Sequence, residues 1–162
     1  MIYIVDGHNL IPKMPGLSLE DVDDELRLIE RLQTFCRIRR CRVEVFFDRA
    51  PAGFSGARSF GAVRAHFVRQ GRIADDAITL HLQRLGKEAR NQTLVSSDRR
   101  VQAEGHSAGA AVISSEEFAG QVLEAEARAA ESARTADKPL STGEVDEWLE
   151  FFKSHPKDSK NS

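Results

Sequence analysis

Short apolar runs that end in a polar residue recur along this chain, and longer segments of helical periodicity separate them. The three clearest runs, each with the carboxylate that follows it, are Ile2–Val5 with Asp6, Arg42–Phe47 with Asp48, and Thr93–Ser96 with Asp98. Continuously apolar runs of this length are typical of strands buried on both faces, and helices between them indicate parallel strands. The pattern therefore predicts an α/β fold, a three-layer α/β/α sandwich with a mainly parallel central sheet.

The remaining segments fit the same fold. The predicted elements are helices over Leu19–Cys36, Ile73–Ala89 and Arg99–Glu104, strands over Val63–Arg69 and Ala110–Ile113, and a long loop over Arg49–Ala62. We expect the Val63–Arg69 strand near an edge of the sheet, and Gly105 to close the third of these helices. A further helix begins after Ser114, which forms a capping-box pattern with Glu117.

The composition changes near Ala129, which predicts two parts, residues 1–128 and residues 129–162. The second part begins with an alanine-rich charged stretch and ends in a short polar tail that is typical of disorder. Between them, "LSTGEVDEWLEFFKSH" predicts a short amphipathic helix with Trp148 on its apolar face. That face either packs on its own domain or docks a partner, including a second copy in a homodimer.

Charge is distributed unevenly along the chain. Residues 31–100 hold fifteen basic and six acidic side chains, whereas the segments on either side are acidic. A basic middle favours a partner rich in phosphate, although scattered solvated arginines give the same count. No apolar run is long enough to span a bilayer, and two cysteines are too few for a disulfide framework, so we expect a cytoplasmic protein.

The carboxylates carry the main functional signal. Because the carboxyl ends of parallel strands meet at one edge of a sheet, Asp6, Asp48 and Asp98 are expected there, with Asp75 at the start of the following helix. Like charges placed together raise one another's pKa, and a divalent cation relieves this cost. Mg²⁺ suits such oxygen ligands. Arginines around an acidic cleft then predict a site that cleaves phosphodiesters.

Each of these residues also has a structural interpretation. An Asp that follows a strand is a common turn or helix N-cap residue. The amide of Asn9 would hold Asp6 or a metal-bound water, and Ser97 would orient Asp98 or touch a phosphate, or both would satisfy local backbone groups. His8 faces away if its strand continues, and His66 and His81 are expected to be structural or exposed. We therefore assign these histidines no catalytic role.

Four motifs in this order resemble the NYN domain of the PIN-like nuclease superfamily, most closely its bacterial YacP-like branch. They are "IVDGHNLI", "VEVFFDRAPAG", "RIADDAI" and "LVSSDRRV", within roughly residues 1–125. The resemblance implies a PIN-like sandwich and a ribonuclease that uses Mg²⁺ or Mn²⁺. It also implies that Asp6, Asp48, Asp75 and Asp98 bind the metal, and that Asn9 and Ser97 belong to the catalytic site. Some members of this branch are linked to cutting of mRNA on the ribosome.

Two functional hypotheses follow. In the first, the chain is a metal-dependent endoribonuclease whose RNA contacts are made by Arg49, Arg58, Arg99 and Arg100. In the second, it is a PIN-like module that binds RNA or the ribosome with weak catalysis or none. A phosphatase with a nucleophilic Asp is disfavoured, because such a site needs a second acid two residues later. Here Arg49 and Ala50 follow Asp48.

Overall fold

A six-stranded sheet forms the centre of the computed structural model, which describes residues 1–19, 23–50, 56–69 and 74–137. The strands are β1 (Ile2–Asp6), β2 (Arg42–Ala50), β3 (Gly56–Phe60), β4 (Val63–Arg69), β5 (Gln92–Val95) and β6 (Ala111–Ile113). They lie in the order β3-β4-β2-β1-β5-β6. Every neighbouring pair is parallel except β3–β4, so the sheet is mainly parallel as predicted.

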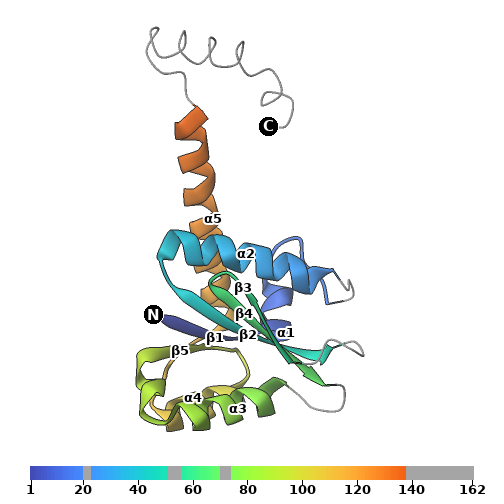
Figure 1. The fold of residues 1–162 in the computed structure, drawn as a ribbon, viewed down its shortest axis with the longest axis vertical. Coiled ribbons are helices and arrows are strands. Elements are labelled where there is room, and N and C mark those ends of the chain that lie inside the picture. The colour runs from blue at the N-terminus through green and yellow to red at the C-terminus, as the bar shows by residue number, and fades with distance from the viewer. Residues whose placement is uncertain (20–22, 51–55, 70–73, 138–162) are drawn as a thin grey trace, which may run out of the picture. The chain divides into compact units, whose positions relative to one another are not determined.

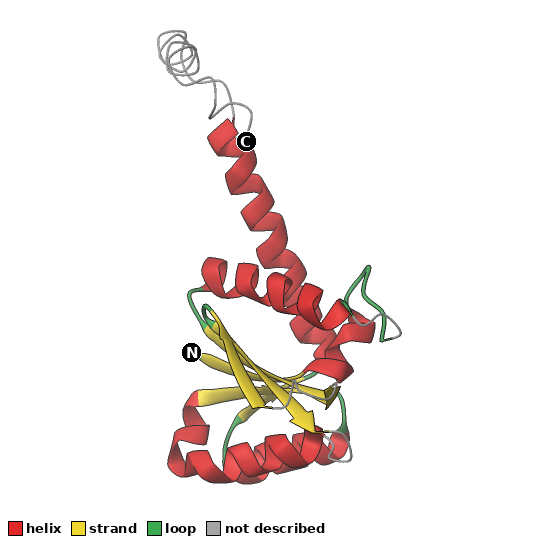
Figure 2. Ribbon diagram, turned by 45° about the vertical axis from the view of Figure 1, so that its right-hand side comes forward, coloured by secondary structure: helices red, strands yellow, loops and turns green. Residues whose placement is uncertain are grey.

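Helices cover both faces of this sheet (Figure 1). They are α1 (Gly7–Leu10), η1 (Ile11–Lys13), α2 (Asp24–Arg39), α3 (Ala74–Leu85), η2 (Gly86–Asn91), α4 (Arg99–Ala108) and α5 (Ser115–Asp137). Figure 2 shows the yellow sheet with α3 and α4 on one side and α2 on the other. The prediction of a three-layer α/β/α sandwich is confirmed.

Alternation along the strands divides the interior into two cores. Tyr3 and Val5 of β1 face a core built with α1, α2 and α5, whereas Ile4 faces a second core built with α3 and α4. Successive side chains of a strand point to opposite faces, so a strand buried on both sides must be apolar at consecutive positions. This is why β1 reads as a continuous apolar run.

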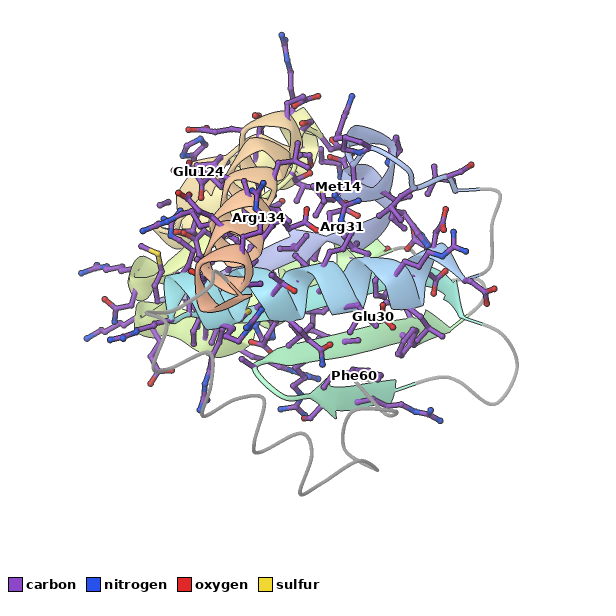
Figure 3. All side chains as sticks on the ribbon, turned by 90° about the horizontal axis from the view of Figure 1, so that it is seen from above. Met14, Glu30, Arg31, Phe60, Glu124 and Arg134 are labelled. Carbon is purple, nitrogen blue, oxygen red and sulfur yellow. The ribbon has the colours of Figure 1, made fainter. Side chains whose placement is uncertain are left out.

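The larger core has an aromatic centre. Tyr3, Phe35 and Phe118 come from β1, α2 and α5, and their ring centroids lie 5.0–5.4 Å apart. Arg31 of α2, labelled in Figure 3, adds a forked hydrogen bond to Glu126 of α5 at 2.8–3.3 Å. These contacts hold the beginning of α5, and therefore the residues just before it, in a defined place against the sheet.

Two sequence predictions about local structure were wrong. The predicted loop Arg49–Ala62 contains the end of β2 and the strand β3. As a result β4 is covered by β3 and is not the last strand of the sheet. Gly105 does not end its helix: it is buried inside α4, where a Cβ would lie 2.6 Å from Leu94 Cδ2. The helix ends at Gly109, which has a φ of 86°.

Three further predictions concern the division of the chain into two parts, the C-terminal helix and the absence of a membrane span. By internal packing, Met1–Ala129 form one compact unit and Ala130–Ser162 a second. The predicted amphipathic helix around Trp148 lies outside the described residues. The helix and the alternatives for its apolar face, packing on its own domain or docking a partner such as a second copy, therefore stay predictions. Within the described residues, no helix combines the length and the apolar character needed to cross a membrane.

A carboxylate holds α3 against the sheet. Glu44 of β2 lies with Oε1 3.0 Å from His66 Nε2 of β4 and with Oε2 3.1 Å from His81 Nε2 of α3. The rings of Phe46 and His66 stack beside them with centroids 4.3 Å apart. The hydrogen bond from His66, followed by the close contact with His81, holds the pKa of Glu44 well below its ordinary value.

We expect Gly7→Ala to lower the free energy of unfolding by about 1–3 kcal/mol, because no space exists for a methyl group. A Cβ at Gly7 would lie 2.5 Å from two ring carbons of Phe47 and 2.9 Å from the Phe46 carbonyl oxygen. Urea denaturation measures the loss. Gly120→Ala is the matched control, since nothing lies within 4 Å of its Cβ position. Equal stability of the two variants would contradict the packing argument.

Glu44→Gln is expected to lower stability by about 1–3 kcal/mol near neutral pH, because the charged hydrogen bonds are lost. A carboxylate with a depressed folded pKa stabilises fully above its unfolded pKa, here 4.5, and loses this contribution as the pH falls. The native chain should therefore approach the variant in stability below about pH 4.5. Denaturation curves at several pH values check this, with the exposed Glu88→Gln as control. A pH-independent difference would refute it.

Candidate active site

Three acidic residues lie at the carboxyl edge of three adjacent parallel strands. Asp6 is the last residue of β1, where it is in register with Phe46 of β2, and Val5 is in register with Val95 of β5. Asp48 follows two residues after Phe46, and Asp98 follows three residues after Val95. The topology therefore brings the ends of segments that are far apart in sequence to one edge of the sheet.

The beginning of α3 lies at the same edge. Asp75 is in the first turn of α3, and its side chain lies outside the described side chains. Its neighbour Asp76 lies with Oδ1 3.9 Å from Arg100 Nη2, on exposed side chains. Because Arg100 is two residues from Asp98, this contact places the first turn of α3 next to the first turn of α4.

Asp98 has a structural role in addition to its candidate catalytic one. It is the N-cap of α4, and its Oδ1 accepts a hydrogen bond of 2.9 Å from the Arg100 amide. Its own amide donates to Ser96 Oγ at 3.1 Å, and Ser96 is fully buried. The carboxylate itself is exposed. The cap orients this carboxylate without burying it, so it remains accessible from solvent.

Asn9 joins three segments of the site. Its Oδ1 accepts hydrogen bonds from the Ser97 amide at 2.8 Å and from Ser115 Oγ at 2.5 Å. Since both partners donate, the oxygen must face them, and the amide NH₂ points away with its two donors. Within the described part of the chain these donors have no protein partner. Asn9 is therefore a linker between α1, the end of β5 and α5, and its NH₂ group points away from both of these contacts.

Ser97 is held by a residue that the sequence did not single out. Its hydroxyl donates to Glu116 Oε2 at 2.6 Å and accepts from the Ser115 amide at 3.0 Å. The protein partners of the hydroxyl are therefore Glu116 and Ser115 and not the carboxylate of Asp98, and its predicted contact with a phosphate stays a prediction. Glu116 Oε1 also lies 3.0 Å from Lys13 Nζ. The hydrogen bonds from Ser97 and then Lys13 lower the pKa of Glu116 to about 2.

His8 contacts the end of β2. The chain leaves β1 after Asp6 and turns into α1, so His8 does not continue the alternation of the strand. Its Nδ1 accepts a hydrogen bond of 3.1 Å from the Asp48 amide, which places the proton on Nε2, 3.0 Å from Glu25 Oε1. His8 thus fixes the backbone at Asp48, a role that a strand-based interpretation could not find.

The predicted arginines do not form one group. Arg99 and Arg100 lie in the first turn of α4, beside Asp98, and both are exposed. Arg58 is on β3, with β4 between that strand and β2. Arg49 belongs to β2, and its side chain lies outside the described side chains. The structure therefore places Arg99 and Arg100 next to Asp98 and Arg58 two strands away from β2, and the predicted role of Arg49 stays a prediction.

The donor chemistry of this edge fits a hard divalent cation. Among the residues that the structure describes, no three acidic, histidine or cysteine side chains converge on a common metal position. Mg²⁺ needs only one or two carboxylates, because waters and substrate phosphates complete its shell. Asp6, Asp48 and Asp98 supply carboxylate oxygens from adjacent segments, and Asp75 belongs to the neighbouring first turn of α3.

An α/β/α sandwich with acidic residues along the carboxyl edge of its parallel strands is compatible with a nuclease-like class of protein. A family model described as the YacP-like NYN domain matches residues 3–153, so the chain belongs to this family. The match confirms the resemblance in the motifs and continues past residue 125. Family membership gives the chain a nuclease-like function related to RNA.

Solved structures support the fold. The crystal structure of Rae1 (YacP) from Bacillus subtilis matches with a TM-score of 0.72 at 23% identity, over 99% of this chain and 95% of that one. Its W164L mutant matches with a TM-score of 0.68 at 24% identity, over 89% and 88% of the two chains. No curated protein sequence gives a significant match.

We expect Asn9→Ala to lower the free energy of unfolding by about 1–3 kcal/mol, since it leaves the buried Ser115 hydroxyl and the Ser97 amide without their acceptor. Asn9→Asp keeps an acceptor oxygen and should retain more stability than Asn9→Ala. Urea denaturation compares the variants, and Asn91→Ala, at an exposed position of η2, is the control. An Asn9→Ala variant as stable as the control would show that the network contributes nothing to folding.

Proposed function

We propose that this protein is an endoribonuclease that uses Mg²⁺ or Mn²⁺ to hydrolyse phosphodiester bonds of RNA. The observation that carries the proposal is the position of Asp6, Asp48 and Asp98 at the carboxyl edge of three neighbouring parallel strands, with the first turn of α3 beside the first turn of α4. A chain that gathers carboxylates accepts electrostatic repulsion, and a cation bound between them is the physical reason to keep them together. Membership of the YacP-like NYN family supports the same conclusion.

In this proposal Asp6, Asp75 and Asp98 hold the cation, and Asp48 lies close to it. When bound, the cation supplies charge stabilisation for the phosphoryl oxygens and makes water a stronger nucleophile. The free NH₂ donors of Asn9 orient a water or a phosphate oxygen. Arg99 and Arg100 are exposed beside Asp98, where they can bind the RNA backbone.

RNA engaged by the ribosome is one substrate that the proposal includes. A module that binds RNA or the ribosome without cutting is the alternative, and it shares the fold and the basic residues. The two differ in a single observable, which is whether purified protein with Mg²⁺ or Mn²⁺ produces new RNA ends. Absence of cleavage with naked RNA and with translating ribosomes, combined with retained RNA binding, would establish the binding module.

The sharpest test uses Asp98, because Asn caps a helix as well as Asp does. We expect Asp98→Asn to keep the stability of the native chain. Mutating a residue that only supports a metal ligand lowers activity by roughly 10–100-fold. If Asp98 binds the metal directly, Asp98→Asn should lower kcat/KM by more than this. Asp6→Asn should lose activity to a similar extent. Cleavage of a labelled single-stranded RNA with Mg²⁺ measures both variants.

Glu104→Gln, at an exposed position of α4, is the control for a lost negative charge and should cleave like the native chain. Asp98→Ala adds the loss of the cap, about 1 kcal/mol of stability, to the loss of the carboxylate. Native rates for Asp98→Asn would mean that Asp98 serves only as a cap, and native rates for Asp6→Asn as well would end the metal-dependent proposal.

A further inference from the structure

One cation, Lys13, is tied to the candidate site by the carboxylate of a distant helix. Lys13 ends η1, and its Nζ lies 3.0 Å from Oε1 of Glu116, in the first turn of α5. The other oxygen of Glu116 accepts the Ser97 hydroxyl at 2.6 Å. Glu116 therefore bridges a lysine to a residue of the site, and a chain of polar contacts leads from Lys13 through Ser97 to Asn9.

The ion pair between Lys13 and Glu116 contributes little to the stability of the fold. The side chains of Lys13 and Glu116 are 40% and 54% exposed, and ion pairs at such positions contribute roughly 0–1 kcal/mol because solvent screens them. Elsewhere the site is fixed by contacts to buried groups, such as Ser115 and Ser96. The geometry of the pair therefore needs another explanation.

The position of Lys13 supplies this explanation. The carboxyl edge carries Asp6, Asp48, Asp76 and Asp98, which repel a polyanion, and cations beside these acids offset that repulsion. Arg100 lies toward α3, where it contacts Asp76. Lys13 is paired with Glu116 of α5. Its neighbour Met14 packs in the core with Phe118 of α5, whereas Val101 of α4 packs in the second core, on the other face of the sheet. An ammonium group has three donors, and one contact with Glu116 leaves two for phosphate oxygens.

Glu116 keeps the ammonium group in place across the physiological range. A carboxylate is charged at neutral pH, and the hydrogen bonds from Ser97 and then Lys13 lower the pKa of Glu116 further, so it attracts the ammonium group throughout this range. The same bond commits the single proton of the Ser97 hydroxyl to Glu116. Lys13, and not Ser97, is consequently the donor that can reach a phosphate on this side of the site.

We propose that Lys13 binds a backbone phosphate of the RNA substrate and that Glu116 is the positioning residue that holds it there. This inference rests on the proposed function, because the ligand is the RNA that the site cleaves. The contact is electrostatic and independent of base sequence. It is made in the ground state as well as during the reaction, so it acts on binding more than on the chemical step.

The test measures binding of a short labelled single-stranded RNA in a buffer with Ca²⁺ in place of Mg²⁺, at several salt concentrations. The logarithm of the binding constant falls as the logarithm of the salt concentration rises, and losing one phosphate contact to a single strand makes this slope less steep by about 0.7. We expect Lys13→Ala to show this decrease with an affinity about 3–10-fold weaker, and Lys13→Arg to keep the native slope. Lys87→Ala, on η2 at the opposite end of β5, is the matched control and should bind like the native chain.

Two further readouts separate a phosphate contact from a general structural effect. In the cleavage assay with Mg²⁺, Lys13→Ala should raise KM and leave kcat within about twofold. For Glu116→Gln, a double-mutant cycle with Lys13→Ala should give non-additive changes in binding, because the two side chains act as one unit. Additive changes would overturn the positioning role of Glu116.

The outcomes distinguish this inference from the proposed function. If the native chain binds RNA and Lys13→Ala binds with the native affinity and salt slope, the inference is wrong and the proposed function stands. If Lys87→Ala loses as much as Lys13→Ala, the effect is one of net charge and the inference also fails. If the native chain neither binds nor cuts RNA, both proposals fail together.

Discussion

The two hydrogen bonds that Asn9 Oδ1 accepts are the constraint on which the site depends. They join the turn after β1 to the Ser97 amide and to the buried Ser115 hydroxyl at the beginning of α5. The turn itself is possible because Gly7 lets the backbone pass against Phe47. Without this junction the ends of β1 and β5 would still be neighbours in the sheet, but the segments beyond them would have no common anchor.

The electrostatics of the edge follow from how each acid is held. Asp98 is bound to a helix N-terminus and Glu116 to a serine and a lysine, so each carboxylate has a local source of positive potential. Such partners lower the cost of placing like charges near one another. They do not remove the need for a counter-charge at the centre of the edge. In the proposed function a bound dication supplies this counter-charge, and its positive charge also attracts the phosphates of a substrate.

The parts of this structure that the sequence could predict are those that depend on local pattern. The apolar runs that end in Asp6, Asp48 and Asp98 indicated parallel strands and one common edge, because strand burial leaves a direct mark on hydrophobicity. The strand β3 left no such mark: four of its five residues are exposed, so its sequence resembles a loop. The prediction that Gly105 ends a helix was wrong for a similar reason. A glycine that allows close packing, here against Leu94, cannot be distinguished in one sequence from a glycine that ends a helix.

Contacts between distant segments could not be read from one sequence. Glu116 fits the ordinary preference for acids in the first turn of a helix. Nothing in that preference predicts its contact with Lys13, which lies far from it in the sequence, near the N-terminus. The link exists only because the helix that begins after β6 packs against the same face as η1, through Phe118 on one side and Met14 on the other. The same packing gives Ser97 its partner. A candidate site built only from motif residues therefore omits the groups that orient it, and here those groups include a cation suited to the phosphate chain.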